Sequence, residues 1–194
     1  MSELNSIALK IVSSGKGILA ADESNGTMTK RLDSVGVSSS PESRLKFRNT
    51  LFTSDSIKSC IGGVLLYDET IKQSVGSNSI PSLILENGSI PGIKVDTGAK
   101  ILSSSKEEKI TEGLDGLRER LKEYYKLGAR FAKWRAVYII TETYPSQVAI
   151  STNAHALARY ASLVQESGMV PIVEPEVLME GSHNSKTCFE KTSE

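Results

Sequence analysis

The chain has 194 residues, of which 39% are apolar and 24% are charged, and its 23 basic residues balance its 23 acidic ones. This length fits one globular domain over residues 1–194, and zero net charge gives no bulk attraction to nucleic acid or to an anionic membrane. The N-terminus has no leader pattern and no apolar run approaches the ~20 residues of a membrane span, so we expect a cytoplasmic protein with small-molecule partners.

One unit recurs along the chain: an amphipathic helix, a residue that ends it, and a short apolar strand. The first copy is predicted as a helix over about residues 4–12 and a strand over 17–21. A second helix begins at Ser40-Pro41, because a capping residue followed by proline is typical of a helix start. It precedes a strand over 60–67.

The second half of the chain holds the clearest copies. Leucines at helical spacing predict a helix over residues 113–127 that Gly128 ends, and another helix begins after Pro145-Ser146. The strands of this half are predicted at residues 92–96, 129–134 and 169–173.

Five strands separated by helices, with no hairpin signal between them, predict βα units and a parallel sheet. The spacing is 39 residues from Lys94 to Lys133 and 41 from Lys133 to Glu174. This regular interval suits a (βα)8 barrel, which commonly takes ~250 residues. We therefore predict an α/β fold of the parallel TIM-barrel family with about five of its eight units. A doubly wound open sheet remains the alternative.

Charged residues stand where the apolar strands end, which is the edge of a parallel sheet that binds ligands. Lys133 and Arg135 share one face of their strand, and Glu174 and Glu176 share one face of theirs. Two cations should therefore face two carboxylates. The candidate residues at the strand ends are Asp22, Glu23, Ser24, Lys94, Asp96, Lys133, Arg135, Glu174 and Glu176.

Two interpretations of these charges are open. They can be buried ion pairs that satisfy one another. Alternatively they bind an anionic substrate such as a sugar phosphate, because near Lys94, Lys133 and Arg135 the cations outnumber what pairing needs. A lysine close to other cations and away from water would then have a lowered pKa, and a glutamate beside it could move protons for a reacting carbonyl.

The loop over residues 22–27 is a second candidate. It offers hydroxyls, a glycine and backbone N–H groups as a phosphate cradle, with Lys30 and Arg31 close behind. It is not a P-loop, because it lacks the Gly-Lys-Ser/Thr ending. The alternative is an ordinary Asx-type turn that caps a helix.

The cysteines and histidines do not predict a metal site. Cys60 and Cys188 lie far apart at no metal-ligand spacing and are expected to be free thiols. His155 and His183 are equally scattered, whereas a zinc site needs three or four clustered ligands. We expect the site to work without a metal.

Five segments together are far more specific than any single pattern. They span residues 15–24 (GKGILAADES), 92–96 (GIKVD), 113–117 (GLDGL), 131–135 (FAKWR) and 170–176 (VPIVEPE). In this order and spacing they resemble the signature segments of the class I fructose-1,6-bisphosphate aldolases, on the bacterial and plastid side of that family. The resemblance runs from about Ile7 to the last residue.

The resemblance implies a (βα)8 barrel that cleaves fructose 1,6-bisphosphate to dihydroxyacetone phosphate and glyceraldehyde 3-phosphate in glycolysis and gluconeogenesis. It implies a lysine Schiff base, no metal and no other cofactor, and a full-length form that is a homo-oligomer. Asp22 matches the carboxylate that helps C–C cleavage, and Lys133 matches the lysine that supports carbinolamine formation. Glu174 matches the general acid/base, with Glu176 tuning the Schiff-base environment.

The resemblance also assigns one phosphate site. Ser24, Thr27, Lys94 and Arg135 match positions that grip a substrate phosphate, and Lys30 and Arg31 are further matches. Thr27 stands where a serine is usual and keeps the hydroxyl donor.

One departure from the family is large. The family's Schiff-base lysine lies on the sixth strand, in a Leu-Lys-Pro-type segment, and loops after later strands bind the second phosphate. Neither Lys94 nor Lys133 matches that lysine. We therefore expect an N-terminal portion of an aldolase barrel that is inactive alone and that associates through its exposed strand edge. A sugar-phosphate-binding or scaffolding form without catalysis is the alternative, whereas the match of all five segments disfavours another Schiff-base barrel aldolase with a different substrate.

Overall fold

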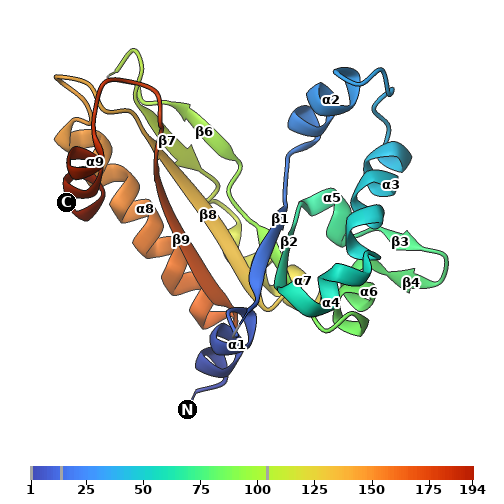
Figure 1. Cartoon of the computed structure of the whole chain (residues 1–194). Helices are drawn as coiled ribbons and strands as arrows, with labels where there is room; N and C mark the ends of the chain where they lie inside the picture. The colour runs from blue at the N-terminus through green and yellow to red at the C-terminus, as the bar shows by residue number, and fades with distance from the viewer. Residues whose placement is uncertain (1, 14, 104) are drawn as a thin grey trace.

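A five-stranded parallel sheet is the centre of the fold (Figure 1). The computed structural model describes residues 2–13, 15–103 and 105–194. The strand order is β1-β2-β5-β8-β9, so the order in space follows the order in sequence. A chain that adds each strand on the same side winds as a barrel does, which excludes the doubly wound alternative. The strands are Gly17–Ala21 (β1), Ile61–Leu66 (β2), Ile90–Lys94 (β5), Phe131–Tyr138 (β8) and Val170–Val177 (β9).

The fold is thus an α/β half-barrel, and the predicted parallel TIM-barrel class is confirmed. Figure 1 shows the strands diverging from α1, so that their carboxyl ends open between α2 on one side and β6–β7 on the other. The edge strands β1 and β9 are each paired on one side only within the described residues. The predicted association through these edges stays a prediction.

The helices begin and end at residues that the sequence marks. Ser40 caps its helix with a capping box ahead of Pro41. Gly128, with φ at 113°, ends another. The helix expected from residue 113 begins only at Leu117, because Gly116 takes the left-handed φ of 64°. The helices are Glu3–Ile11 (α1), Asn25–Asp33 (α2), Pro41–Phe52 (α3), Asp55–Cys60 (α4), Asp68–Ile71 (α5), Ile80–Glu86 (α6), Leu117–Leu127 (α7), Gln147–Glu166 (α8) and Ser185–Ser193 (α9).

Two antiparallel hairpins that the sequence did not predict lie outside the five-stranded sheet. The first pairs Ser74–Val75 (β3) with Asn78–Ser79 (β4), and its strands of two residues are too short to show an alternating pattern. The second pairs Gly98–Ile101 (β6) with Lys109–Glu112 (β7). Its long connection carries no two-residue turn signal, so hairpin rules for sequence do not detect it.

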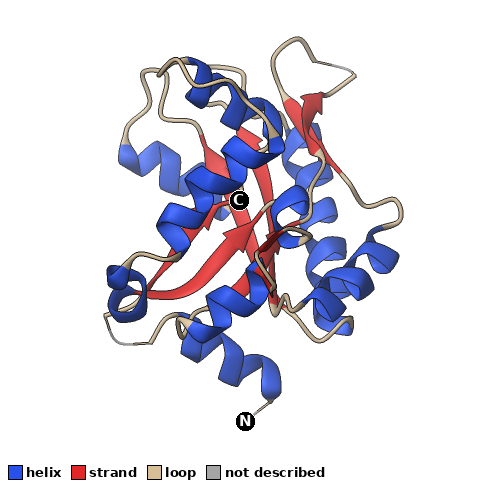
Figure 2. Ribbon diagram, turned by 90° about the vertical axis from the view of Figure 1, so that its right-hand side faces the viewer, coloured by secondary structure: helices blue, strands red, loops and turns tan. Residues whose placement is uncertain are grey.

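The outer face of the sheet carries the main apolar core, with helices packed around it (Figure 2). Trp134 and Tyr160 lie at its centre with ring centroids 5.5 Å apart, both fully buried. The Tyr160 hydroxyl donates a hydrogen bond to the Ala132 carbonyl at 2.7 Å and ties α8 to β8. None of the described helices combines the length and the apolar composition that crossing a membrane would require.

The inner face is layered. A small apolar cluster of Ile11, Leu65, Ile90 and Phe131 fills the end next to α1. Phe131 fits because its neighbour Gly92 has no side chain: a Cβ there would lie 2.4 Å from the Phe131 ring. Above this apolar floor, β5 ends at Lys94, β8 carries Lys133 and Arg135, and β9 carries Glu174 and Glu176. The fold therefore gathers the charges at the carboxyl ends of the strands.

Candidate active site

The carboxyl ends of the strands surround an open cavity of about 500 Å³. Eight of the ten predicted site residues line it, and they come from the loop after β1, the start of α2, and strands β5, β8 and β9. The eight are Asp22, Ser24, Thr27, Lys94, Lys133, Arg135, Glu174 and Glu176.

Lys133 contacts two carboxylates in the cavity. Its Nζ lies 2.8 Å from Asp22 Oδ2 at the end of β1 and 3.4 Å from Glu174 Oε2 on β9. Its side chain is 13% exposed, whereas that of Glu174 is 35% exposed and accessible from the cavity. Burial would lower the pKa of Lys133, but the hydrogen bond and charge of Asp22, with Glu174, raise it. The expected lowered lysine pKa is therefore wrong for Lys133, because its neighbours are carboxylates.

Arg135 and Lys94 are also paired. Arg135 Nε donates to Glu176 Oε2, and this hydrogen bond is the main cause that raises the pKa of Arg135. Lys94 Nζ donates to Asp96 Oδ1 and, at 3.1 Å, to the Asp96 carbonyl. Lys133 and Arg135 thus face Glu174 and Glu176 on the neighbouring strand, as the two-residue spacing in the sequence predicted.

The predicted excess of cations is wrong. Besides its three cations, the cavity is lined by five carboxylates, which are Asp22, Glu23, Asp96, Glu174 and Glu176. The sequence argument named Glu23 and Asp96 as candidates but did not count them as partners of the cations. An anionic ligand must therefore compete with these carboxylates for Lys94 and Arg135.

The start of α2 forms one wall of the cavity. Ser24 is the N-cap of α2, and its Oγ accepts from the Thr27 N–H at 3.3 Å and contacts Thr27 Oγ1 at 3.1 Å. The capping-turn alternative therefore describes the local geometry. A helix N-terminus also favours an anion, so the phosphate cradle remains a prediction that this geometry allows.

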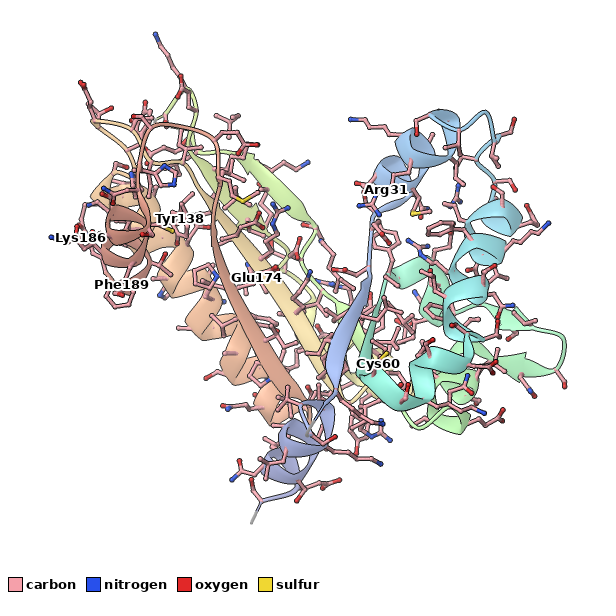
Figure 3. The ribbon with its side chains drawn as sticks, in the orientation of Figure 1. Arg31, Cys60, Tyr138, Glu174, Lys186 and Phe189 are labelled. Atoms are coloured by element: carbon pink, nitrogen blue, oxygen red, sulfur yellow. The ribbon has the colours of Figure 1, made fainter. Side chains whose placement is uncertain are left out.

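Lys30 and Arg31 are not among the residues that line the cavity. Both are exposed on α2, and Arg31 forms an ion pair with Glu23. Figure 3 shows Arg31 beyond the end of β1 and Glu174 on β9, across the opening of the half-barrel. Contact of Lys30 or Arg31 with a substrate stays a prediction.

The sequence argument missed the wall formed by the β6–β7 hairpin. Thr97, Gly98 and Ala99 line the cavity next to Asp96, whose Oδ1 also accepts from the Gly98 N–H at 3.1 Å. Thr111 ties this hairpin to β8, because its Oγ1 donates to the Arg135 carbonyl at 2.7 Å. The Asp-Thr-Gly turn signal after the third strand indicates a turn there, although not a hairpin.

The protonated state of Lys133 predicts a pH dependence of stability. A lysine pKa raised by folding stabilises the fold fully below the unfolded pKa of about 10.5, and this stabilisation is lost as the pH rises through the folded pKa. Above pH ~10.5, the free energy of unfolding should fall more steeply for the wild type than for Lys133→Met, by up to about 1.4 kcal/mol per pH unit. Urea unfolding between about pH 9 and 11.5 measures both slopes. Parallel curves would contradict the pairing.

Within residues 2–13, 15–103 and 105–194, no three His, Cys, Asp or Glu side chains are grouped so that they could hold a metal ion. The described Cys60 and Cys188 are both free thiols.

Comparison with known proteins places these residues in a family. The family model described as "Fructose-bisphosphate aldolase class-I" matches residues 3–194. A "Probable fructose-bisphosphate aldolase class 1" of Xylella fastidiosa (strain Temecula1) is 52% identical over 99% of this chain. "Fructose-bisphosphate aldolase C" of Pan troglodytes is 52% identical over 96% of it.

The same comparisons show how much of those proteins this chain spans. It covers 58% of the Xylella relative and 52% of the Pan relative. A solved structure of fructose-bisphosphate aldolase from Plasmodium falciparum, in complex with TRAP and a small-molecule inhibitor, superposes with a TM-score of 0.92 at 46% identity. That match covers 96% of this chain and 55% of the Plasmodium chain.

Proposed function

The chain belongs to the class I fructose-bisphosphate aldolases, and on this premise we propose that it supplies the proton-transfer part and one phosphate-binding part of a site that cleaves fructose 1,6-bisphosphate. The observation that supports this proposal most directly is the position of Lys133 between Asp22 and Glu174. These three residues come from β8, from the end of β1 and from β9, so only the folded sheet brings them together.

The chemistry of aldol cleavage fits this arrangement. When the C–C bond breaks, its electron pair moves toward the carbon derived from the ketone, and the hydroxyl of the departing fragment loses its proton to become an aldehyde. Glu174, whose side chain is 35% exposed, is placed to accept such a proton. The Lys133 ammonium is placed to hydrogen-bond the substrate oxygens, and Asp22 orients it.

The phosphate of the substrate is proposed to lie against Lys94, Arg135 and the Ser24 end of α2. Lys94 and Arg135 reach the cavity from β5 and β8. Both already have a carboxylate partner, so binding exchanges one anion for another and demands little movement of the cations.

We further propose that residues 1–194 alone do not form the covalent Schiff base. That step needs a neutral amine, whereas the two lysines in the cavity lining are both ion-paired, and the pKa of Lys133 is raised. The ion pairing also favours the second candidate, a sugar-phosphate-binding form without turnover. Borohydride treatment in the presence of dihydroxyacetone phosphate tests the proposal, and mass spectrometry should show no adduct. A stoichiometric adduct on Lys94 or Lys133 would contradict it.

Substrate binding is the complementary prediction. Titration calorimetry with fructose 1,6-bisphosphate should give binding that Arg135→Met weakens by roughly 10- to 100-fold, because a hydrogen bond to a charged group contributes about 1.5–3 kcal/mol. Lys46→Met, which removes an exposed cation on α3 outside the cavity lining, is the matched control and should leave the affinity unchanged. Equal losses in both variants would show a non-specific charge effect instead of a site.

A further inference from the structure

Arg48 on α3 is a fully buried cation that does not line the cavity. Its Nη2 donates to the backbone carbonyl of Glu23 and lies 3.7 Å from the Glu23 carboxylate. Its Nη1 donates to Thr70 Oγ1 at 2.7 Å. The guanidinium therefore links α3 to α5, through Thr70, and to Glu23, which lies between Asp22 and Ser24 in the loop after β1.

The burial of this cation is energetically unfavourable for the folded state. Burial lowers the pKa of Arg48, and the charge of Glu23 offsets this only in part. Arg48 Nε and Glu23 Oε2 are both buried without a hydrogen-bond partner among the described residues. Apolar residues in place of such an imperfect buried pair often stabilise a protein. The contact with Glu23 is therefore better explained by what it positions than by what it contributes to stability.

We propose that Arg48 is a positioning residue that fixes the loop carrying Asp22 and Ser24. The Glu23 carbonyl that it holds belongs to the peptide group between Glu23 and Ser24, one residue after Asp22, whose carboxylate lies 2.8 Å from Lys133 Nζ. A rotation of that peptide would move Asp22 away from Lys133 and turn the Ser24 cap of α2.

A second contact holds the other side of Ser24. Asn25 Nδ2 donates to Glu69 Oε2 at 3.1 Å, and Glu69 is itself held by Arg44. With residues 23 and 25 both fixed from α3 and α5, Ser24 between them has little freedom. The consequence for substrate binding rests on the proposed function, whereas the positioning of the loop does not.

The test compares Arg48→Met with Thr70→Val. Arg48→Met removes the bond to the Glu23 carbonyl, whereas Thr70→Val removes the other partner of Arg48 and leaves that bond in place. Both variants should be less stable in urea, because each removes only one partner of a buried polar contact and leaves the other partner unpaired. Only Arg48→Met should shift the amide NMR signals of residues 23–26 and weaken fructose 1,6-bisphosphate binding by roughly 10- to 100-fold.

Several outcomes are decisive. A folded Arg48→Met variant with unchanged loop signals and unchanged affinity overturns the proposal, as does a Thr70→Val variant that changes both equally. If Arg48→Met does not fold, Arg48→Lys takes its place, because it keeps the buried charge but reaches the Glu23 carbonyl poorly. If the wild type does not bind fructose 1,6-bisphosphate, the proposed function fails, and the loop signals still decide the role of Arg48.

Discussion

A chimera that joins residues 1–194 to the part of the Xylella fastidiosa relative that this chain does not cover is expected to cleave fructose 1,6-bisphosphate. Residues 1–194 alone are expected to give no turnover. The chain aligns with 58% of that relative at 52% identity, and among the described residues its edge strands β1 and β9 each pair on one side only, which leaves an edge for further strands. A coupled assay that follows the triose phosphates measures both proteins.

Within this chimera, Lys133→Met should lower kcat by about 10²- to 10³-fold, the range expected when one preorganised hydrogen-bond donor to the reacting oxygens is removed. The variant removes the ammonium and leaves Asp22 and Glu174 without their shared partner. Lys46→Met in the same chimera should retain full activity. A chimera that folds, as judged by circular dichroism, but keeps its kcat without Lys133 would contradict the role given to this residue.

The fold was largely predictable because its signals are local and periodic. Helix spacing, caps and terminating glycines act within one or two turns, and the interval near 40 residues between Lys94, Lys133 and Glu174 reflects one βα unit. The hairpin β6–β7 was not predictable, because its position depends on a contact between residues far apart in sequence, the bond from Thr111 Oγ1 to the Arg135 carbonyl of β8.

The sequence predicted most of the residues that line the cavity, but it did not predict how their charges pair. The period of two along a strand shows that Lys133 and Arg135 face one side, and the end of each strand shows which edge they occupy. Which carboxylate pairs with which cation depends on the register between strands and on the conformation of the loop after β1. Neither can be read from the sequence pattern. For the same reason, nothing in the sequence around Arg48 indicates that it holds Glu23.

The largest effect on stability is expected from Gly92→Ala, at the apolar floor beneath the charges. A Cβ at this position would lie 2.4–2.5 Å from three atoms of the Phe131 ring, which is fully buried on the paired strand β8. Overpacking of a core site typically costs 1–3 kcal/mol, and we expect about 3 kcal/mol here because the added Cβ meets three ring atoms of a fully buried side chain. Urea unfolding measures the change in the free energy of unfolding.

Gly17→Ala on β1 is the matched control, because no heavy atom lies within 4 Å of its added Cβ, and it should leave stability unchanged or raise it by up to about 1 kcal/mol. Phe131→Leu should restore part of the stability lost in Gly92→Ala, which a double-mutant cycle detects. Register pairs Gly92 with Phe131 and, two residues further along, Lys94 with Lys133. If Gly92→Ala pushes β5 and β8 apart, the two lysines should also move apart and sugar-phosphate binding should weaken. A Gly92→Ala variant with wild-type stability would show that the Gly92–Phe131 contact does not set the spacing of the charged residues above it.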